Sequence, residues 1–226
     1  MPYALDPLRI EFPHPRYADE DGLLAVGGDL SPQRLTLAYQ YGIFPWYSED
    51  TPILWYAPHE RFVLFPDQIV ISKSMRKVLS SNTFVMTFNQ SFERVIRACA
   101  SIERPGQQGT WIVEEMIEAY LRMHELGRAH SVEVWQENQL VGGLYGVLVG
   151  RVFCGESMFS AVSNASKAAL IYLCLAFDLE LIDCQIHSDH LASMGAEAMS
   201  QQEFLDILAR QEYQQHGLQE LFRHPG

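Results

Sequence analysis

The spacing of apolar residues changes between a strand-like repeat and a helical repeat along the chain. Strand-like alternation and short apolar runs predict strands at residues 62–64, 69–71, 84–88, 131–136, 140–150, 151–160 and 180–186. Helical spacing, with its start and stop residues, predicts helices at residues 32–41, 72–79, 90–100, 114–127, 164–177, 188–194 and 201–213. Short turns join the strands between 131 and 160, so we expect an antiparallel three-stranded meander there. This order of elements is typical of an α+β fold with a mixed sheet.

The stretch over residues 151–170 joins a strand directly to the start of a helix. Strand alternation places Glu156 and Met158 on one side and Phe153 on the other. A carboxylate on an otherwise apolar strand is costly to bury unless its surroundings are polar or occupied. Two interpretations stay open: Glu156 belongs to a functional site, or it lies on a solvated face while Met158 packs at an edge.

The composition is that of a folded globular protein. The 226 residues are 48% hydrophobic and 19% charged. No apolar run approaches the ~18 residues needed to cross a bilayer, and the N-terminus lacks the basic start and apolar core of a signal peptide. The four cysteines are scattered, with no C-x-x-C pair. We therefore expect a cytoplasmic protein with no membrane partner, no structural disulfide and no cysteine-based zinc site.

The formal net charge of −12 argues against a nucleic-acid partner. The charge is unevenly distributed, since seven basic and three acidic residues between Arg61 and Arg104 give that segment a charge of +4. Such a segment could meet a polyanion at one face of the protein while the acidic remainder meets a cation. Scattered, solvated charges are the simpler interpretation of so small an excess.

Candidate chemistry elsewhere in the chain is sparse. No Walker loop, G-x-G-x-x-G, H-E-x-x-H or G-x-S-x-G motif is present. His187 and His190 could bind a metal beside Asp183, but a histidine pair without further ligands is usually polar surface, so no metal site is expected. Asp183 and Gln185 share one face of the predicted strand. They could hold and orient an amine, or they could form a hydrogen-bonded pair at the sheet edge.

Aromatic residues are concentrated in a proline-punctuated stretch that contains Trp46 and Trp55. Aromatic side chains on such a stretch either anchor it to the core or offer flat faces on which bases stack. Composition alone favours the anchoring role.

The order of the motifs resembles the leucyl/phenylalanyl-tRNA–protein transferase family. The match covers residues 23–195 and rests on G-G-D-L-S-P, G-I-F-P-W-Y, I-L-W-Y-A-P, G-T-W-I, H-S-V-E-V-W, L-V-G-G-L-Y-G-V, F-C-G-E-S-M-F-S, N-A-S-K-A-A-L and L-I-D-C-Q. The resemblance implies a small N-terminal domain, residues 1–60, and a GNAT-like (acetyltransferase-like) catalytic domain, residues 61–226. It also implies transfer of Leu or Phe, and less well Met, from aminoacyl-tRNA to an N-terminal Arg or Lys. That transfer marks the acceptor protein for degradation as an N-degron, and no cofactor is implied.

The resemblance also assigns substrate-binding roles by matching motif. Trp46 and Trp111 would hold the terminal adenine of the tRNA between their rings. Glu156 would orient the aminoacyl group at the edge of a side-chain pocket. That pocket would be lined by Phe153, Met158 and Phe177. Strand alternation places the first two of these on opposite sides, and a bulge near Gly155 would reconcile the two expectations.

The remaining assignments concern the acceptor amine and the tRNA stem. Asp183 would attract the incoming ammonium group and, with Gln185, align the amine as it loses a proton. The catalytic requirement is light, because the aminoacyl ester is already activated and a model α-amino group has a pKa of ~7.7–8.0. Positioning of the two reactants could then supply much of the acceleration. The uneven charge, rather than the resemblance, leads us to expect that the acceptor stem follows the basic 61–104 segment, at Lys73, Arg76 and Lys77.

Three other functions compete with this one. A GNAT-type N-acyltransferase that uses acyl-CoA is one, and a related aminoacyl-tRNA-dependent peptidoglycan enzyme is another. The chain lacks the Gly-rich pyrophosphate loop of a CoA user, since N-A-S-K-A-A-L is a poor phosphate cradle. The third is a module that binds basic N-termini without chemistry, against which the tryptophan pair and the Asp183/Gln185 pair both argue.

Overall fold

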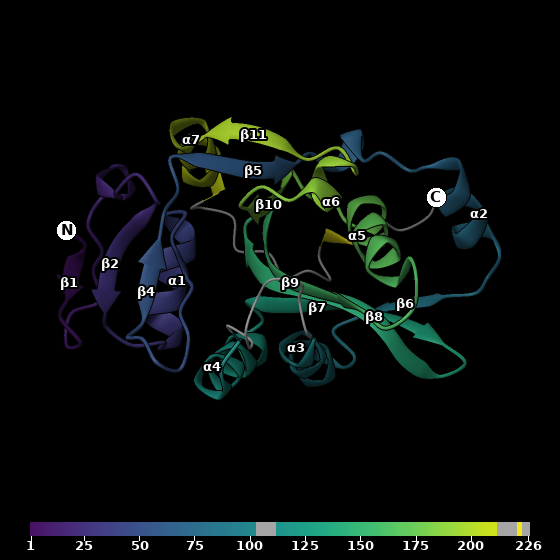
Figure 1. The fold of residues 1–226 in the computed structure, drawn as a ribbon, viewed down its shortest axis with the longest axis horizontal. Helices are drawn as coiled ribbons and strands as arrows, with labels where there is room; N and C mark the ends of the chain where they lie inside the picture. Colours follow the sequence, from purple (N-terminus) through teal and green to yellow (C-terminus); the bar gives the residue numbers. More distant parts are fainter. Residues whose placement is uncertain (103–111, 212–220, 223–226) are drawn as a thin grey trace.

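A small four-stranded sheet forms the N-terminal part of the chain. The computed structural model describes residues 1–102, 112–211 and 221–222. The sheet has the order β1-β2-β4-β3 and is built from β1 (Tyr3–Leu5), β2 (Leu23–Gly27), β4 (Leu54–Tyr56) and β3 (Phe44–Pro45). Helix α1 (Pro32–Gln40) packs beside it (Figure 1). Ser31 caps this helix by accepting a hydrogen bond from the backbone N–H of Arg34, as the Ser-Pro start predicts.

A seven-stranded mixed sheet forms the larger part of the molecule. Its strand order is β11-β5-β10-β9-β8-β7-β6. The strands are β5 (Glu60–Leu64), β6 (Val85–Phe88), β7 (Ala129–Gln136), β8 (Gln139–Val149), β9 (Val152–Ser160), β10 (Leu181–Gln185) and β11 (Glu197–Ser200). Strands β7, β8 and β9 form the predicted antiparallel meander, whereas β9 and β10 run parallel. The α+β class with a mixed sheet is thus confirmed.

Helices cover both faces of the larger sheet. Helices α3 (Phe92–Ser101) and α4 (Glu114–Glu125) lie on one face and α5 (Ala165–Ala176) on the other (Figure 1). Helix α7 (Gln201–Gln211) packs on β5 and β11, and the short α6 (Asp189–Ala192) follows β10. Two single-turn helices, Pro15–Tyr17 and Pro66–Gln68, complete the set in the described residues.

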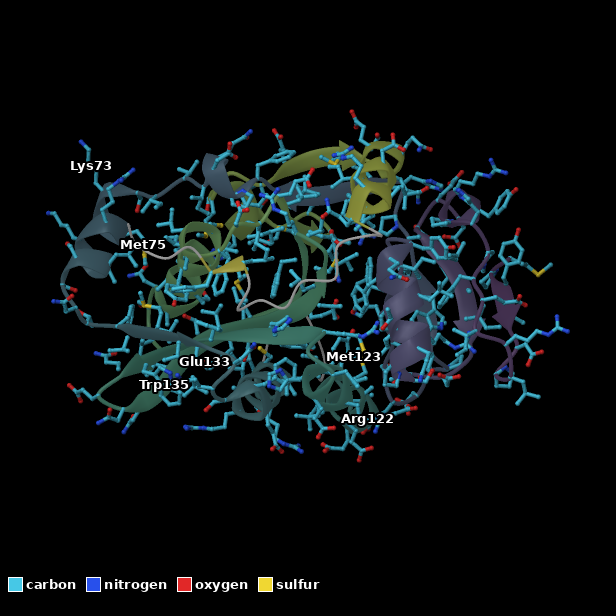
Figure 2. The ribbon with its side chains drawn as sticks, turned by 180° about the vertical axis from the view of Figure 1, so that it is seen from behind. Lys73, Met75, Arg122, Met123, Glu133 and Trp135 are labelled. Atoms are coloured by element: carbon cyan, nitrogen blue, oxygen red, sulfur yellow. The ribbon has the colours of Figure 1, made fainter. Side chains whose placement is uncertain are left out.

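Helix α2 (Lys73–Ser80) lies at the end of the molecule opposite the N-terminal sheet (Figure 1). Its Met75 is buried, whereas Lys73 points outward (Figure 2). Helix α4 shows the same two-sided character, with Met123 in the core and Arg122 in solvent (Figure 2). Each of these helices therefore packs on the rest of the protein through one apolar face.

One hydrophobic core runs from the N-terminal sheet into the face covered by α3 and α4. Trp55 and Leu35 of the N-terminal part belong to the same buried cluster as Met116 and Phe204. The division of the chain into residues 1–60 and 61–226 stays a prediction. Within the described residues, no helix is long and apolar enough to cross a membrane.

The structure corrects the sequence-based assignment in two places. Residues 69–71, predicted as a strand, have no strand structure, although the backbone N–H of Val70 donates to the carbonyl of Met194. The edge of β5 is taken instead by β11, which the sequence did not predict because its four residues, E-A-M-S, show little strand pattern. The strands of the N-terminal sheet were not predicted either, since each has only two to five residues.

Candidate active site

The candidate site lies where two parallel strands part. Strands β9 and β10 pair through three residues each, and the last pair is Cys154 with Asp183. The register of each strand with its other neighbour shifts immediately afterwards, which leaves Glu156 as an extra residue in β9 and Cys184 as one in β10. Bulges of this kind bend a strand and increase its twist. The two bulges therefore coincide with the point where the strands stop pairing.

A cavity of about 450 Å³ lies beyond this point. Its walls come from β8 and β9, from β10 with the segment after it, from α5, and from β3 with the residue that follows it. The apolar side chains in these walls include Phe44, Pro45, Trp46, Leu144, Phe153, Met158, Leu170, Leu173, Ile182, Ile186 and Leu191. A concave, mainly apolar cavity with a few convergent polar groups is the usual form of a small-molecule site.

The bulge in β9 brings Phe153 and Met158 into the same cavity. Tyr145 of β8 pairs with Ser157, and the next residue, Gly146, pairs with Gly155, so Glu156 has no partner of its own. This confirms the predicted bulge near Gly155. A Cβ atom on Gly146 would collide with the carbonyl oxygen of Cys154, so a larger residue would displace the backbone there.

Glu156 is buried at the floor of the cavity and is bonded on both oxygens. Gln185 Nε2 donates to its Oε1 at 2.7 Å, and the Tyr120 hydroxyl donates to its Oε2 at 2.9 Å. The Tyr120 hydroxyl also forms a short hydrogen bond with the hydroxyl of Tyr39. Of the interpretations left open by the sequence, the structure excludes the solvated face. Only 7% of Glu156 is exposed.

Burial is the main influence on the Glu156 carboxyl group. It raises the pKa of Glu156 from 4.5 to about 7, against the opposing effect of hydrogen bonds from Tyr39, Tyr120 and Gln185. Burial together with the nearby Glu156 charge also raises the pKa values of both tyrosines well above their ordinary value. Both forms of Glu156 are consequently populated near neutral pH, while the tyrosines keep their protons.

Asp183 already has a cationic partner within the protein. Arg61 of β5 donates to its two carboxylate oxygens at 3.1 and 2.5 Å, and both side chains are almost completely buried. The guanidinium group also donates to the carbonyl of Gly42 and lies between the rings of Phe44 and Phe204. Because Arg61 balances its charge, Asp183 is suited to orienting its neighbours. The sequence predicted a different role for Asp183, namely the attraction of the incoming ammonium group.

Gln185 is fixed at both its backbone and its side chain. Its backbone N–H donates to Oδ1 of Asp183 at 2.9 Å, and its φ of +65° lies in the left-handed region. Its side-chain amide is held by Glu156. The bulge at Cys184 interrupts the simple alternation expected for residues 182–186. Asp183, Gln185 and Glu156 nevertheless form one hydrogen-bonded group, since Asp183 accepts from the Gln185 backbone and Glu156 accepts from its side chain.

Trp46 stands at the rim of the cavity, 38% exposed. Trp46 directly follows strand β3, and the centroids of its ring and the Tyr56 ring are 5.6 Å apart. Trp55, by contrast, is wholly buried and donates from Nε1 to the carbonyl of Gly27. The two tryptophans of this stretch thus divide between the two interpretations, since one anchors the core and the other is available for stacking. Trp111 lies outside the described residues.

Phe177 is placed away from the cavity wall. It is completely buried at the end of α5, and its ring packs against those of Phe88, Tyr172 and Phe222. It is not among the residues that line the cavity. Phe177 therefore lies in the hydrophobic core at the end of α5.

Two of the basic side chains in the segment 61–104 are already paired with carboxylates of the protein. Arg61 is buried against Asp183, and Arg97 is paired with Glu93 and Glu114. The side chains of Lys73, Arg76 and Lys77 are exposed on α2. Helix α2 therefore presents three exposed basic side chains close together, and Arg94 on α3 is exposed as well.

No metal centre is assembled in the part of the chain that the structure describes, since no group of three or more His, Cys, Asp or Glu side chains comes together there. His187 contacts the ring of Phe62, and its Nε2 lies 3.8 Å from a carboxylate oxygen of the exposed Asp189. Three residues of the H-S-D-H motif, His187, Ser188 and His190, line the cavity.

Three residues of the site were not predicted from the sequence. Arg61 stood out only as part of a basic segment, and Tyr39 and Tyr120 had the pattern of ordinary helical residues. Each is joined to its partner across a long stretch of chain: 122 residues for Arg61 and Asp183, and 81 for the two tyrosines. No local pattern indicates such a pairing.

Two family models match the chain. The model described as leucyl/phenylalanyl-tRNA protein transferase covers residues 63–209, and the model of that family's N-terminal domain covers residues 28–59. A protein of Flavobacterium johnsoniae named leucyl/phenylalanyl-tRNA–protein transferase is 57% identical over 200 residues, which is 87% of this chain and 94% of that protein. A protein of Syntrophus aciditrophicus with the same name is 57% identical over 204 residues, 89% of this chain and 85% of the relative.

Likeness to solved structures is much weaker. A GCN5-related N-acetyltransferase from Kribbella flavida matches with a TM-score of 0.36 and 8% identity over 73% of this chain and 60% of that protein. That protein has the fold expected from the sequence, but a TM-score this low adds nothing to what the mixed sheet itself shows. The identity to the named relatives and the match of both models are far stronger findings. The chain belongs to the leucyl/phenylalanyl-tRNA–protein transferase family and is an aminoacyltransferase, an enzyme that transfers an aminoacyl group from tRNA to a protein.

Proposed function

We propose that this enzyme transfers Leu or Phe, and less well Met, from aminoacyl-tRNA to proteins that begin with Arg or Lys. The added residue marks the acceptor for degradation as an N-degron, and we place the reaction in the cytoplasm. The observation that carries the proposal is the apolar cavity beside Trp46, because it has room for one uncharged side chain and ends on the polar group formed by Glu156 and Gln185.

The tRNA end would bind at the rim of the cavity. Trp46 offers a partly exposed ring there, and stacking of a base on such a ring is typically worth ~1–3 kcal/mol. The aminoacyl side chain would then extend past Phe153 and Met158 into the cavity. Apolar walls favour Leu, Phe and Met over polar amino acids, whose side chains would lose hydrogen bonds to water. Trp111 is proposed as the second ring on the adenine from its motif alone.

The acceptor amine would be aligned by Gln185. Its side-chain nitrogen is occupied by Glu156, so its amide oxygen is the atom suited to accept a hydrogen bond from the amine. Asp183 holds the backbone of Gln185 and acts as a positioning residue. The net charge of −12 favours the approach of a cationic N-terminus.

The reaction is aminolysis of an ester and needs no redox step. The neutral α-amino nitrogen attacks the ester carbonyl carbon, a C–N bond forms, and the C–O bond to the ribose breaks. The amine gives up one proton, and the ribose hydroxyl that leaves takes one up. The protein contributes alignment of the two reactants, which can supply up to ~7–11 kcal/mol of the barrier reduction.

Labelled Leu-tRNA and a set of short peptides test the proposal. A peptide that begins with Arg or Lys should be labelled. The same peptide with an acetylated N-terminus, or with Ala in the first position, should not. Label on the Ala peptide at the same rate would overturn the acceptor assignment, and equal transfer of Ser from Ser-tRNA would overturn the assignment of the cavity.

A further inference from the structure

A chain of hydroxyl groups leads from helix α1 to the floor of the cavity. Tyr39 of α1 is hydrogen bonded to Tyr120 of α4, and Tyr120 is hydrogen bonded to Glu156 of β9. Gln185 of β10 closes the chain from the other side. The two tyrosines are almost completely buried and neither lines the cavity. Any influence of these hydroxyl groups on the reaction must therefore pass through Glu156.

The direction of each hydrogen bond follows from the chemistry of the groups. An ionised carboxylate only accepts, so the single proton of Tyr120 points at Glu156 and its oxygen accepts from Tyr39. For the same reason the Gln185 amide turns its NH2 group toward Glu156. No ion pair to Glu156 occurs among the described residues, so its charge is balanced by neutral donors alone.

Protonation of Glu156 would reverse this arrangement. A carboxylic acid that donates from the oxygen facing Gln185 requires an acceptor there, and the amide supplies one only by turning its oxygen inward. Its NH2 group would then face the cavity. That group cannot accept a hydrogen bond from an attacking amine, so the reactive alignment would be lost.

We propose that Tyr39 and Tyr120 are positioning residues for the transfer reaction, because their hydroxyl groups keep Glu156 in the ionised state that turns the Gln185 amide oxygen toward the acceptor amine. This inference rests on the proposed role of Gln185. It gives the carboxylate on an otherwise apolar strand a function, which is to fix the orientation of an amide.

Several titratable groups surround Glu156 and set its protonation. They are Tyr39 on α1, Tyr120 on α4, Cys154 on β9, and Asp183 on β10 with its partner Arg61 on β5. Tyr145 on β8 acts on Tyr120. Asp183 raises the pKa of Glu156, and Asp183 is itself ion-paired with Arg61. Burial raises the pKa values of Tyr39, Tyr120 and Cys154, so these groups stay protonated across the range in which Glu156 titrates.

The test is the pH profile of Leu transfer to a peptide that begins with Arg, at saturating Leu-tRNA, for the wild type and Tyr120→Phe. The variant loses one donor to the charged form of Glu156, so the acidic limb of its kcat profile should move to higher pH by about one unit. At pH 7 this appears as a fall of about fivefold in kcat, with recovery toward pH 9 and little change in KM for the tRNA. Tyr39→Phe should shift the limb in the same direction.

Tyr47→Phe is the matched control, because the Tyr47 hydroxyl is also bonded to a carboxylate, that of Glu115, which lies outside the cavity. Its profile should coincide with that of the wild type. A Tyr120→Phe profile lowered equally at every pH would overturn the inference, as would an equal shift in Tyr47→Phe. If Tyr120→Phe fails to fold, the shift in Tyr39→Phe decides. A wild type that labels no Arg peptide contradicts the proposed function, whereas unshifted variants of an active wild type contradict this inference alone.

Discussion

Arg61 and Asp183 form a buried ion pair directly beneath the candidate site, in which guanidinium nitrogens lie 3.1 and 2.5 Å from the two carboxylate oxygens. The pair ties β5 to β10, and through Gly42 it also ties the end of α1 to the larger sheet. One carboxylate oxygen accepts as well from the backbone N–H of Gln185. The pair therefore connects the packing of the two sheets to the residue that we expect to align the acceptor amine.

Breaking this pair from one side should destabilise the protein strongly. Arg61→Met leaves the Asp183 carboxylate buried without a cation, and removal of one partner from a buried pair typically costs ~3–5 kcal/mol. Urea unfolding measures the free energy of unfolding directly. The double variant Arg61→Met/Asp183→Asn removes both charges and should be more stable than Arg61→Met alone. Equal or lower stability of the double variant would contradict the pairing.

The ion pair also predicts how Asp183→Asn affects catalysis. If Asp183 acts by holding Gln185, the variant should lower kcat by up to about a hundredfold, through misplacement of the amide, and leave KM for an Arg-initiated peptide nearly unchanged. Direct attraction of the ammonium group by Asp183 would instead raise KM for the peptide. Steady-state kinetics with the peptide as the varied substrate separates the two roles.

Trp46 should contribute to the binding of the tRNA end and little to the chemical step. Trp46→Ala removes a stacking face at the cavity rim, so KM for Leu-tRNA should rise by about 5- to 150-fold, the equivalent of ~1–3 kcal/mol. Trp46→Phe keeps a flat ring and should recover most of the loss. Trp135→Ala, on β7 and outside the cavity, is the control. The stacking role would be wrong if Trp46→Ala and Trp135→Ala had equal KM values.

Glu156 should make the stability of the protein depend on pH. Its folded-state pKa of about 7 lies above the ordinary 4.5, so the folded state binds this proton more tightly than the unfolded state does. The contribution is fully present below pH 4.5 and is lost as the pH rises through 7, by roughly 3 kcal/mol in total. Glu156→Gln should remove this loss. Urea unfolding at several pH values measures it, with the exposed Glu118→Gln as control, and parallel curves for wild type and Glu156→Gln would refute the assignment.

The basic side chains of α2 should contribute to tRNA affinity by neutralising phosphates. Reversal of Lys73, Arg76 and Lys77 to Glu should raise KM for Leu-tRNA and flatten its dependence on salt, by about one unit of slope for each phosphate that is no longer neutralised. Arg122→Glu on α4 changes an exposed charge at a different place on the molecule and serves as control (Figure 2). Identical salt slopes for the wild type and the α2 variant would remove α2 from the tRNA-binding surface.

The parts of the fold that local patterns determine were predictable. The meander over β7, β8 and β9 follows from alternation and short turns, and α1 follows from its Ser-Pro start and Gly stop. The bulge at Glu156 was also predictable. Strand alternation places Phe153 and Met158 on opposite sides, whereas the family resemblance places both in one pocket, and a bulge between them reconciles the two. The short strands of the N-terminal sheet were not predictable, because two to five residues carry little usable period.

The parts of the site that depend on tertiary contacts could not be predicted from the sequence. Trp46 and Trp55 lie in the same stretch, and only the packing shows that one is at a rim and the other in the core. Phe177 was expected at the cavity wall, but the rings of Phe88 and Phe222 hold it behind the wall. Arg61 became part of the site only through its contact with Asp183.

A crystal structure of the protein with phenylalanine joined through a stable amide bond to adenosine tests the central claim most directly. The phenylalanine ring should lie in the cavity against Phe153 and Met158, the adenine should stack on Trp46, and the linking carbonyl should lie within reach of the Gln185 amide. A ligand bound elsewhere on the protein would contradict the account, as would a phenylalanine ring left outside this cavity.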